Sequence, residues 1–147
     1  MILDLSAGYR GIWFDKRFAG VVYVDLRLAV GPDVVADAGR LPFRDGQFDL
    51  VVFDPPHVNG GARSHISRDY GHHTAQEIRD LIAKAGREAW RCTREAGLMA
   101  FKWNDHDQKL KLAVGLLQPF WLPLFGHLVS ERSMRRSSTC WLMLVRR

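Results

Sequence analysis

The segment FDLVVFDPPH, residues 48–57, runs from a largely apolar stretch directly into an acid, two prolines and a histidine. Such a run, without regular alternation of polar residues, is typical of a strand covered on both faces by helices. Each proline fixes its own φ angle and restricts the residue before it. We therefore predict a buried strand that ends at Asp54 in a rigid exit.

Three shorter apolar runs precede this strand, and each ends near an acidic residue. They are Ile2–Leu5, Val21–Val24 and the weaker Val34–Ala36. Strands that alternate with helical or turn segments indicate an α/β sheet, and ligands of such sheets bind outside the carboxyl ends of the strands. The acidic residues are therefore expected to gather at one edge of the sheet.

After this part of the chain the apolar period changes from that of a strand to that of a helix. From Thr74 onward apolar residues recur every three or four positions, and Glu77 follows Thr74 at the spacing of a capping box. An amphipathic helix with Thr74 as its N-cap is predicted. The later elements expected are a strand at Gly97–Trp103, a helix at Asp105–Leu117 that ends before Pro119, and an antiparallel hairpin of Leu122–Val129 and Thr139–Val145.

The composition sets the class of protein. A chain of 147 residues, 47% of them hydrophobic, can bury one core and fits a single domain spanning 1–147. No apolar run approaches the ~20 residues of a membrane span, and no signal-peptide pattern is present, so a cytoplasmic protein without membrane contact is expected. Cys92 and Cys140 form no CxxC pair, and no Cys/His cluster has zinc spacing, which predicts no metal site.

The charge of the chain is compatible with a polyanionic partner. The formal net charge is +5, and clustered Lys and Arg gain affinity for phosphates by releasing condensed counterions. Charge alone does not establish such a partner, because many basic proteins bind no nucleic acid. The last 16 residues nevertheless hold a local excess of arginine: Arg132, Arg135, Arg136, Arg146 and Arg147.

A turn of small residues follows the first strand. The segment DLSAGYRG, residues 4–11, offers a place where the backbone can approach a ligand closely. Asp25 comes 17 residues after Gly8, close to the ~20-residue spacing at which an acid accepts the ribose hydroxyls of a nucleoside cofactor. Ser6 breaks the full GxGxxG pattern, which argues against NAD. Asp37 could accept a hydrogen bond from an adenine amino group, or could be a surface residue of a turn.

The residues after the fourth strand suit chemistry at an amino group. An exocyclic amino group of adenine or cytosine is a poor nucleophile because its lone pair is delocalised into the ring. Two acceptors that bind its hydrogens can direct that lone pair toward a methyl donor. Here these acceptors would be the Asp54 carboxylate and the carbonyl oxygen of Pro55, with His57 packed against the ring.

These segments together resemble the class I S-adenosylmethionine-dependent methyltransferases. DPPH resembles the Asp/Asn/Ser-Pro-Pro-aromatic motif of the amino-methyltransferases among them, and the whole chain is similar to small stand-alone methyltransferases of phages and prophages. The resemblance implies S-adenosylmethionine as cofactor and a Rossmann-like, doubly wound, mostly parallel seven-stranded sheet whose last strand is antiparallel. The residues that it assigns to cofactor binding are Asp4, Ser6, Ala7, Gly8, Asp25, Asp37, Ala38 and Asp54, and those that it assigns to catalysis are Asp54, Pro55, Pro56 and His57.

The sequence departs from this pattern in two places. His57 stands where the motif has Tyr, Phe or Trp, and stacking of a base on an aromatic ring is worth roughly 1 to 3 kcal/mol. Nine residues separate Gly11 from Val21, too few for a long first helix. A truncated first helix predicts a cofactor pocket that is unusually open. It also leaves apolar surface exposed, and we therefore expect the protein to form a homodimer that covers this surface.

We therefore expect a methyltransferase that acts on an amino group of a base in DNA or RNA. The alternatives are methylation of a small molecule or a protein side chain, and a module that binds the cofactor without turnover. The loop 58–73 is expected to order over the substrate. Substrate contacts are predicted for Asn59, Arg63, Lys102 and Trp103.

Overall fold

A computed structural model describes residues 1–57, 73–132 and 137–147. The predictions at Asn59, Arg63, Arg135 and Arg136, like most of the loop 58–73, lie outside these residues. The elements, in chain order, are β1 (Ile2–Asp4), β2 (Val21–Asp25), the 3-10 helix η1 (Leu28–Val30), β3 (Val34–Val35), β4 (Phe48–Phe53), α2 (Ala75–Cys92), β5 (Thr93–Asn104), α3 (Leu110–Leu117), β6 (Trp121–Arg132) and β7 (Ser137–Arg146).

The strands form one seven-stranded sheet in the order β3-β2-β1-β4-β5-β7-β6. Strands β1 to β5 pair in parallel, and β7 is antiparallel to both β5 and β6. This arrangement confirms the mostly parallel sheet with an antiparallel last strand. The chain order reverses between β1 and β4, and in open α/β sheets such a switch point is where ligands bind.

Helix α2 begins as the sequence predicts. The Thr74 hydroxyl accepts a hydrogen bond from the Glu77 amide, and the Glu77 carboxylate accepts one from the Thr74 amide. Gly86 brings α3 close to this helix, because a Cβ there would lie 2.5 Å from a methyl carbon of Leu117. The buried face of α2 has helical spacing and consists of Ile78, Ile82, Ala85, Gly86, Ala89 and Cys92.

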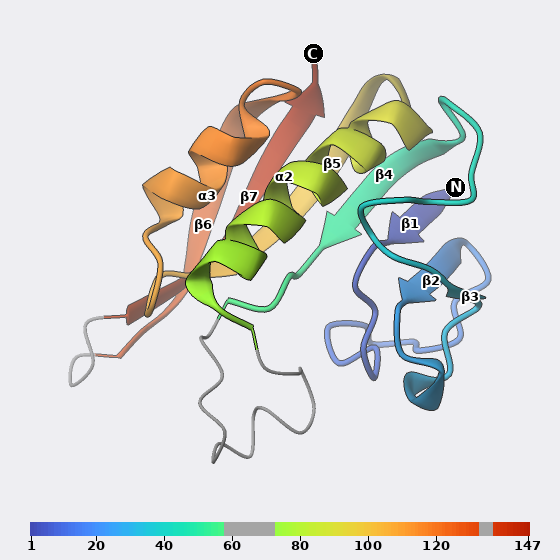
Figure 1. The fold of residues 1–147 in the computed structure, drawn as a ribbon, viewed down its shortest axis with the longest axis horizontal. Coiled ribbons are helices and arrows are strands. Elements are labelled where there is room, and N and C mark those ends of the chain that lie inside the picture. The colour runs from blue at the N-terminus through green and yellow to red at the C-terminus, as the bar shows by residue number, and fades with distance from the viewer. Residues whose placement is uncertain (58–72, 133–136) are drawn as a thin grey trace.

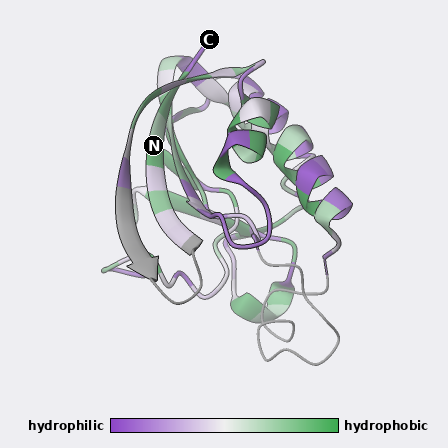
Figure 2. Ribbon diagram, turned by 90° about the vertical axis from the view of Figure 1, so that its left-hand side faces the viewer, coloured by the Kyte–Doolittle hydropathy of each residue, from purple (hydrophilic) through white to green (hydrophobic). Residues whose placement is uncertain are grey.

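Both α-helices lie on the same face of the sheet, as Figures 1 and 2 show from two directions. The described residues between β1 and β2 form turns and bends without an α-helix, in keeping with the short spacing there. Among the described residues a second, smaller buried cluster consists of Ala7, Val21 and Tyr23, with Ile2 and Trp13 packed against it. No helix of the described residues is long and apolar enough to cross a membrane.

The boundaries of two elements, β5 and α3, differ most from the expectation, and β6 and β7 are each longer than predicted. Strand β5 begins at Thr93, because the chain passes from α2 into the strand without a loop. Helix α3 begins at Leu110 rather than at Asp105. The residues before α3 are held by bonds from elsewhere in the chain, since the Ser138 amide donates to Asp105 and the Trp103 indole donates to the carbonyl of Gln108.

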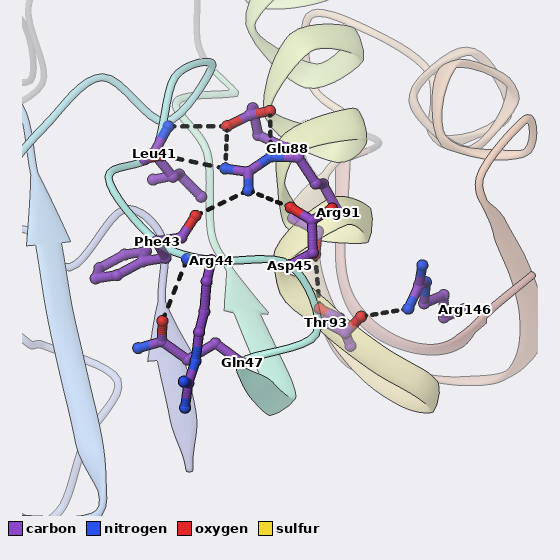
Figure 3. A network of polar contacts seen from close by, with 10 residues as sticks. Leu41, Phe43, Arg44, Asp45, Gln47, Glu88, Arg91, Thr93 and Arg146 are labelled. Carbon is purple, nitrogen blue, oxygen red and sulfur yellow. Dashed lines mark hydrogen bonds and ion pairs between the residues drawn. The ribbon is translucent and has the colours of Figure 1, made fainter.

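An arginine of α2 fixes the long connection between β3 and β4 (Figure 3). The Arg91 guanidinium donates to the carbonyl oxygens of Leu41 and Phe43 and pairs with Asp45 and Glu88. Glu88 in turn accepts the Leu41 amide, and the hydrogen bonds from the Arg91 side chain lower the pKa of Glu88. This network holds against α2 the segment that follows the third strand.

Candidate active site

Three carboxylates meet at the switch point between β1 and β4. Asp4 ends β1, Asp25 ends β2 and Asp54 directly follows β4. Asp4 and Asp25 are buried, and Asp54 is half-buried. The charges of Asp54 and Asp25 both act on Asp4, so the expected gathering of acids is confirmed for these three of the four.

Asp4 is a buried carboxyl with few donors. The Trp13 indole donates to Oδ2 at 2.6 Å, and the Ser6 amide donates to Oδ1 at 3.3 Å. Burial raises the pKa of Asp4 to about 6, against the effect of these two hydrogen bonds, and the neighbouring carboxylates Asp54 and Asp25 raise it further. A positive charge beside Asp4 would favour its ionised form, and it would counteract the rise in pKa caused by burial and by the neighbouring carboxylates.

The glycine turn is bound to Asp25. Gly8 has φ +50°, a left-handed conformation that favours glycine, and its amide donates to Asp25 Oδ2 at 2.9 Å. Ser6 ties the same turn to the DPPH segment, because its hydroxyl accepts the Asp54 amide at 3.1 Å. The residue that breaks the glycine pattern thus joins the two predicted halves of the site.

One carboxylate oxygen of Asp54 is hydrogen-bonded, and the other has no partner among the described residues. Lys102 of β5 donates to Oδ2 at 2.7 Å, and the Lys102 and Asp54 side chains are 25% and 20% exposed. Oδ1 is buried and accepts no hydrogen bond from the residues that the structure describes. Because a buried acceptor without a partner is costly, Oδ1 is a position that favours an incoming donor.

The end of the DPPH segment forms a compact cluster. The His57 Nδ1 lies 3.2 Å from the carbonyl oxygen of Pro55 and 4.0 Å from Asp54 Oδ1. The His57 ring meets the Trp103 ring edge-on, with centroids 6.1 Å apart. The imidazole is therefore beside the two proposed acceptors of an amino group.

A cavity of about 290 Å3 connects the glycine turn with the DPPH segment. Such a volume lies near the lower end of the range for small-molecule sites. Its small residues leave backbone accessible, and its charged residues come from three different parts of the sheet. The cavity is lined by Ser6, Ala7, Gly8, Tyr9, Gly11, Ile12, Arg27, Asp54 and Lys102.

Eight of the predicted site residues that the structure describes do not line this cavity: Asp4, Asp25, Asp37, Ala38, Pro55, Pro56, His57 and Trp103. Asp37 is exposed and accepts the Gly39 amide in a local turn, and Ala38 packs against the main core. Trp103 is a correction to the expected substrate contact, because it is fully buried and stacks on Phe101. Its position alternates along β5 with that of Lys102, which does line the cavity.

Within the described ranges no group of three His, Cys, Asp or Glu side chains could hold a metal ion.

Sequence reasoning missed several residues of the cavity, above all Arg27. Its side chain pairs with Asp25, two positions before it. A basic residue that follows a predicted ligand-binding acid by two positions could have indicated this pair. Tyr9 and Gly11 lie within the segment 4–11 but were not singled out as contacts, and Ile12 directly follows this segment.

Comparisons with known proteins give similarity of structure only. No protein-family model matches the chain, and no curated protein sequence matches it. Among solved structures, the PH0226 protein of Pyrococcus horikoshii OT3 is 14% identical with a TM-score of 0.72, over 99% of this chain and 81% of that chain. A Burkholderia thailandensis 1,6-didemethyltoxoflavin N1-methyltransferase with bound S-adenosylhomocysteine is 14% identical with a TM-score of 0.64, over 99% and 70%.

The cyclase SpnF has the same fold, at 12% identity and a TM-score of 0.68, over 98% of this chain and 73% of that chain. A protein named as a cyclase and one named as a methyltransferase thus match the chain about equally well, so fold alone does not define the reaction. A Methanosarcina mazei protein described as a SAM-dependent methyltransferase also matches, at 12% identity and a TM-score of 0.64, over 99% and 91%. The chain has the fold of the class I S-adenosylmethionine-dependent methyltransferases.

Proposed function

We propose that this protein transfers a methyl group from S-adenosylmethionine to an exocyclic amino group of a base in DNA or RNA. The observation that carries the proposal is Asp54 Oδ1, a buried carboxylate oxygen that accepts no hydrogen bond from the described residues. Asp54 lines the cavity together with the glycine turn. An acceptor for an amino group and a candidate nucleoside site therefore share one space.

The residues around the glycine turn fit the cofactor chemically. Asp25 offers a carboxylate for ribose hydroxyls, and Gly8 leaves room for close approach to the backbone. The three carboxylates Asp4, Asp25 and Asp54 lie near one another, and Arg27 and Lys102 balance the charges of Asp25 and Asp54. The cofactor supplies a methyl group that its sulfonium charge already activates, so the chain has to supply binding and orientation.

The acceptor amine would be oriented by the two oxygens of the DPPH segment. Asp54 Oδ1 would accept one amine hydrogen and the carbonyl oxygen of Pro55 the other. Lys102 holds Oδ2, which keeps the carboxylate in one rotamer and balances its charge. Correct orientation of two reactants can lower a barrier by about 7 to 11 kcal/mol, and the proposed reaction relies mainly on this effect.

The basic character of the chain supports a nucleic acid as substrate. Its net charge of +5 would favour association with phosphates. The pattern of two acceptors around one nitrogen fits a planar aromatic amine, which has two hydrogens in the plane of the ring. The same pattern does not suit a cationic ammonium group of a lysine side chain, because Lys102 lies against Asp54.

A second candidate is methylation of a nitrogen on a small heterocycle. The modest cavity of about 290 Å3 favours it, as does the structural match to a protein named as an N1-methyltransferase of 1,6-didemethyltoxoflavin. Both candidates use the same residues around the reacting nitrogen. They differ in whether phosphate contacts contribute to binding.

The test is to supply S-adenosylmethionine with a labelled methyl group together with DNA, RNA, free nucleosides or a small-molecule extract. The proposal predicts label on an amino nitrogen of a nucleic-acid base, identified by mass spectrometry of the digested product. Label only in the small-molecule arm would support the second candidate. Label on a carbon or an oxygen, or on no acceptor, would contradict amino-group methylation.

A further inference from the structure

Arg27 forms an ion pair with Asp25, the carboxylate that the proposed function assigns to the ribose hydroxyls. Its Nε lies 3.0 Å from Asp25 Oδ1, and its Nη2 lies 3.2 Å from Asp25 Oδ2. The guanidinium thus engages both oxygens, and Arg27 also lines the cavity. Ribose hydroxyls that bind to Asp25 would need the same oxygens.

The Arg27 side chain also lies over the glycine turn. A Cβ atom built on Gly8 would stand 3.7 Å from Arg27 Nη2, and among the described residues no other atom outside the two chain neighbours of Gly8 lies within 4 Å. The space beside Gly8 is the close approach that a ligand at this turn would use. One side chain therefore covers both the acid and the turn.

Asp25 does not depend on the Arg27 side chain for its orientation. The Gly8 amide donates to Oδ2 at 2.9 Å and the Arg27 amide to Oδ1 at 2.9 Å. Burial alone would raise the pKa of Asp25, but the hydrogen bonds from the Arg27 side chain and from these two amides outweigh it, and the pKa lies below its usual value. The backbone bonds remain in any variant at position 27 that folds.

We propose that Arg27 is an internal competitor of the cofactor, which must leave Asp25 before the ribose hydroxyls can bind. This inference rests on the proposed function, because it takes Asp25 as the ribose acceptor. The Arg27 side chain is 36% exposed, so it can turn toward solvent. Solvent screens the Arg27 half of the pair, although the Asp25 side chain is only 8% exposed, and we expect the competition to lower cofactor affinity about two- to fivefold.

Calorimetric titration with S-adenosylhomocysteine tests this role without turnover. This ligand lacks the sulfonium charge, so removing a positive side chain does not by itself improve its electrostatic attraction. The Arg27→Met variant is expected to bind it about two- to fivefold more tightly than the unmodified protein. Arg17→Met, which removes the same charge from an exposed residue outside the cavity lining, is the matched control and should leave the affinity unchanged.

A pair of ligands isolates the ribose contact. Adenosine should gain affinity in Arg27→Met, whereas 2′,3′-dideoxyadenosine should gain none, because it has no hydroxyls that require Asp25. Equal gains for both ligands, or an unchanged or weaker affinity for S-adenosylhomocysteine in Arg27→Met, would overturn the proposal. Thermal denaturation without ligand verifies that the variant is folded, and Arg27→Lys, which cannot engage both oxygens in the same way, should give an intermediate affinity.

The outcomes separate this inference from the proposed function. Arg27→Met could bind the nucleoside more weakly while the protein still methylates an amino group, and only the competitor role would then be wrong. Tighter binding in the same variant, with no methyl transfer to any amino acceptor, would contradict the proposed function and leave the competitor role in place.

Discussion

The replacement of Asp4 by Asn should change how the stability of the protein depends on pH. Asp4 is 1% exposed, and burial raises its pKa from 3.8 to about 6. Between these two values the folded protein binds more protons at Asp4 than the unfolded chain does. The contribution of Asp4 to stability is therefore present below about pH 3.8 and is lost as the pH rises through about 6.

The size of this effect follows from the shift. A change of about 2 pKa units corresponds to about 3 kcal/mol, at about 1.4 kcal/mol for each unit. The free energy of unfolding of Asp4→Asn minus that of the unmodified protein should therefore increase by about 3 kcal/mol between about pH 3 and about pH 7. Only the change with pH is predicted, because Asn also alters the hydrogen bonds with Trp13 and Ser6.

Urea denaturation followed by tryptophan fluorescence across this pH range measures the difference. Asp49→Asn is the control of opposite sign, because hydrogen bonds from the N-terminal ammonium and Arg94 lower the pKa of Asp49. The stabilising effect of the ionised Asp49 carboxylate in the unmodified protein should therefore be lost as the pH falls. A free-energy difference for Asp4→Asn that stays constant with pH would refute the argument from burial.

Further expectations concern the substrate and the assembly. Replacing His57 by Tyr should preserve or improve turnover if the ring packs on a base, and loss of turnover, measured as the initial rate, would indicate that the imidazole moves a proton. Turnover on nucleic acid should fall steeply with added salt, and turnover that is insensitive to salt would favour a small uncharged substrate. The face of the sheet opposite α2 and α3 has no α-helix over it among the described residues, and Leu122 and Phe125 of β6 are exposed, so we propose that the protein self-associates. A monomer in analytical ultracentrifugation at micromolar concentration would contradict this.

Much of the fold follows from local patterns in the sequence. The apolar runs define β1, β2 and β4, because the central strands of a parallel sheet are buried on both faces. The capping box and apolar period define α2. The start of α3 was not predictable from local patterns, because one of the bonds that hold residues 105–109 comes from Ser138, 33 residues after Asp105.

The candidate site could be predicted in part for similar reasons. Acids at the ends of parallel strands converge because of the topology, so Asp4, Asp25 and Asp54 could be placed together from the sequence. The partners of these acids could not, because the side chain of Arg27 or Lys102 reaches its carboxylate only in the folded chain. The alternation along β5 could have assigned Trp103 to the core, since it shares its face of the strand with Met99 and Phe101.

The measurement that tests the central claim most directly compares methyl transfer and cofactor binding in Asp54→Ala. If Asp54 orients the acceptor amine, the turnover number on the identified acceptor should fall about a hundredfold or more. The dissociation constant for S-adenosylhomocysteine should change little, and Asp80→Ala, in which an exposed acid of α2 outside the cavity lining is replaced, should keep turnover. Undiminished turnover in a folded Asp54→Ala would contradict the account, whereas lost turnover with unchanged cofactor affinity would support it.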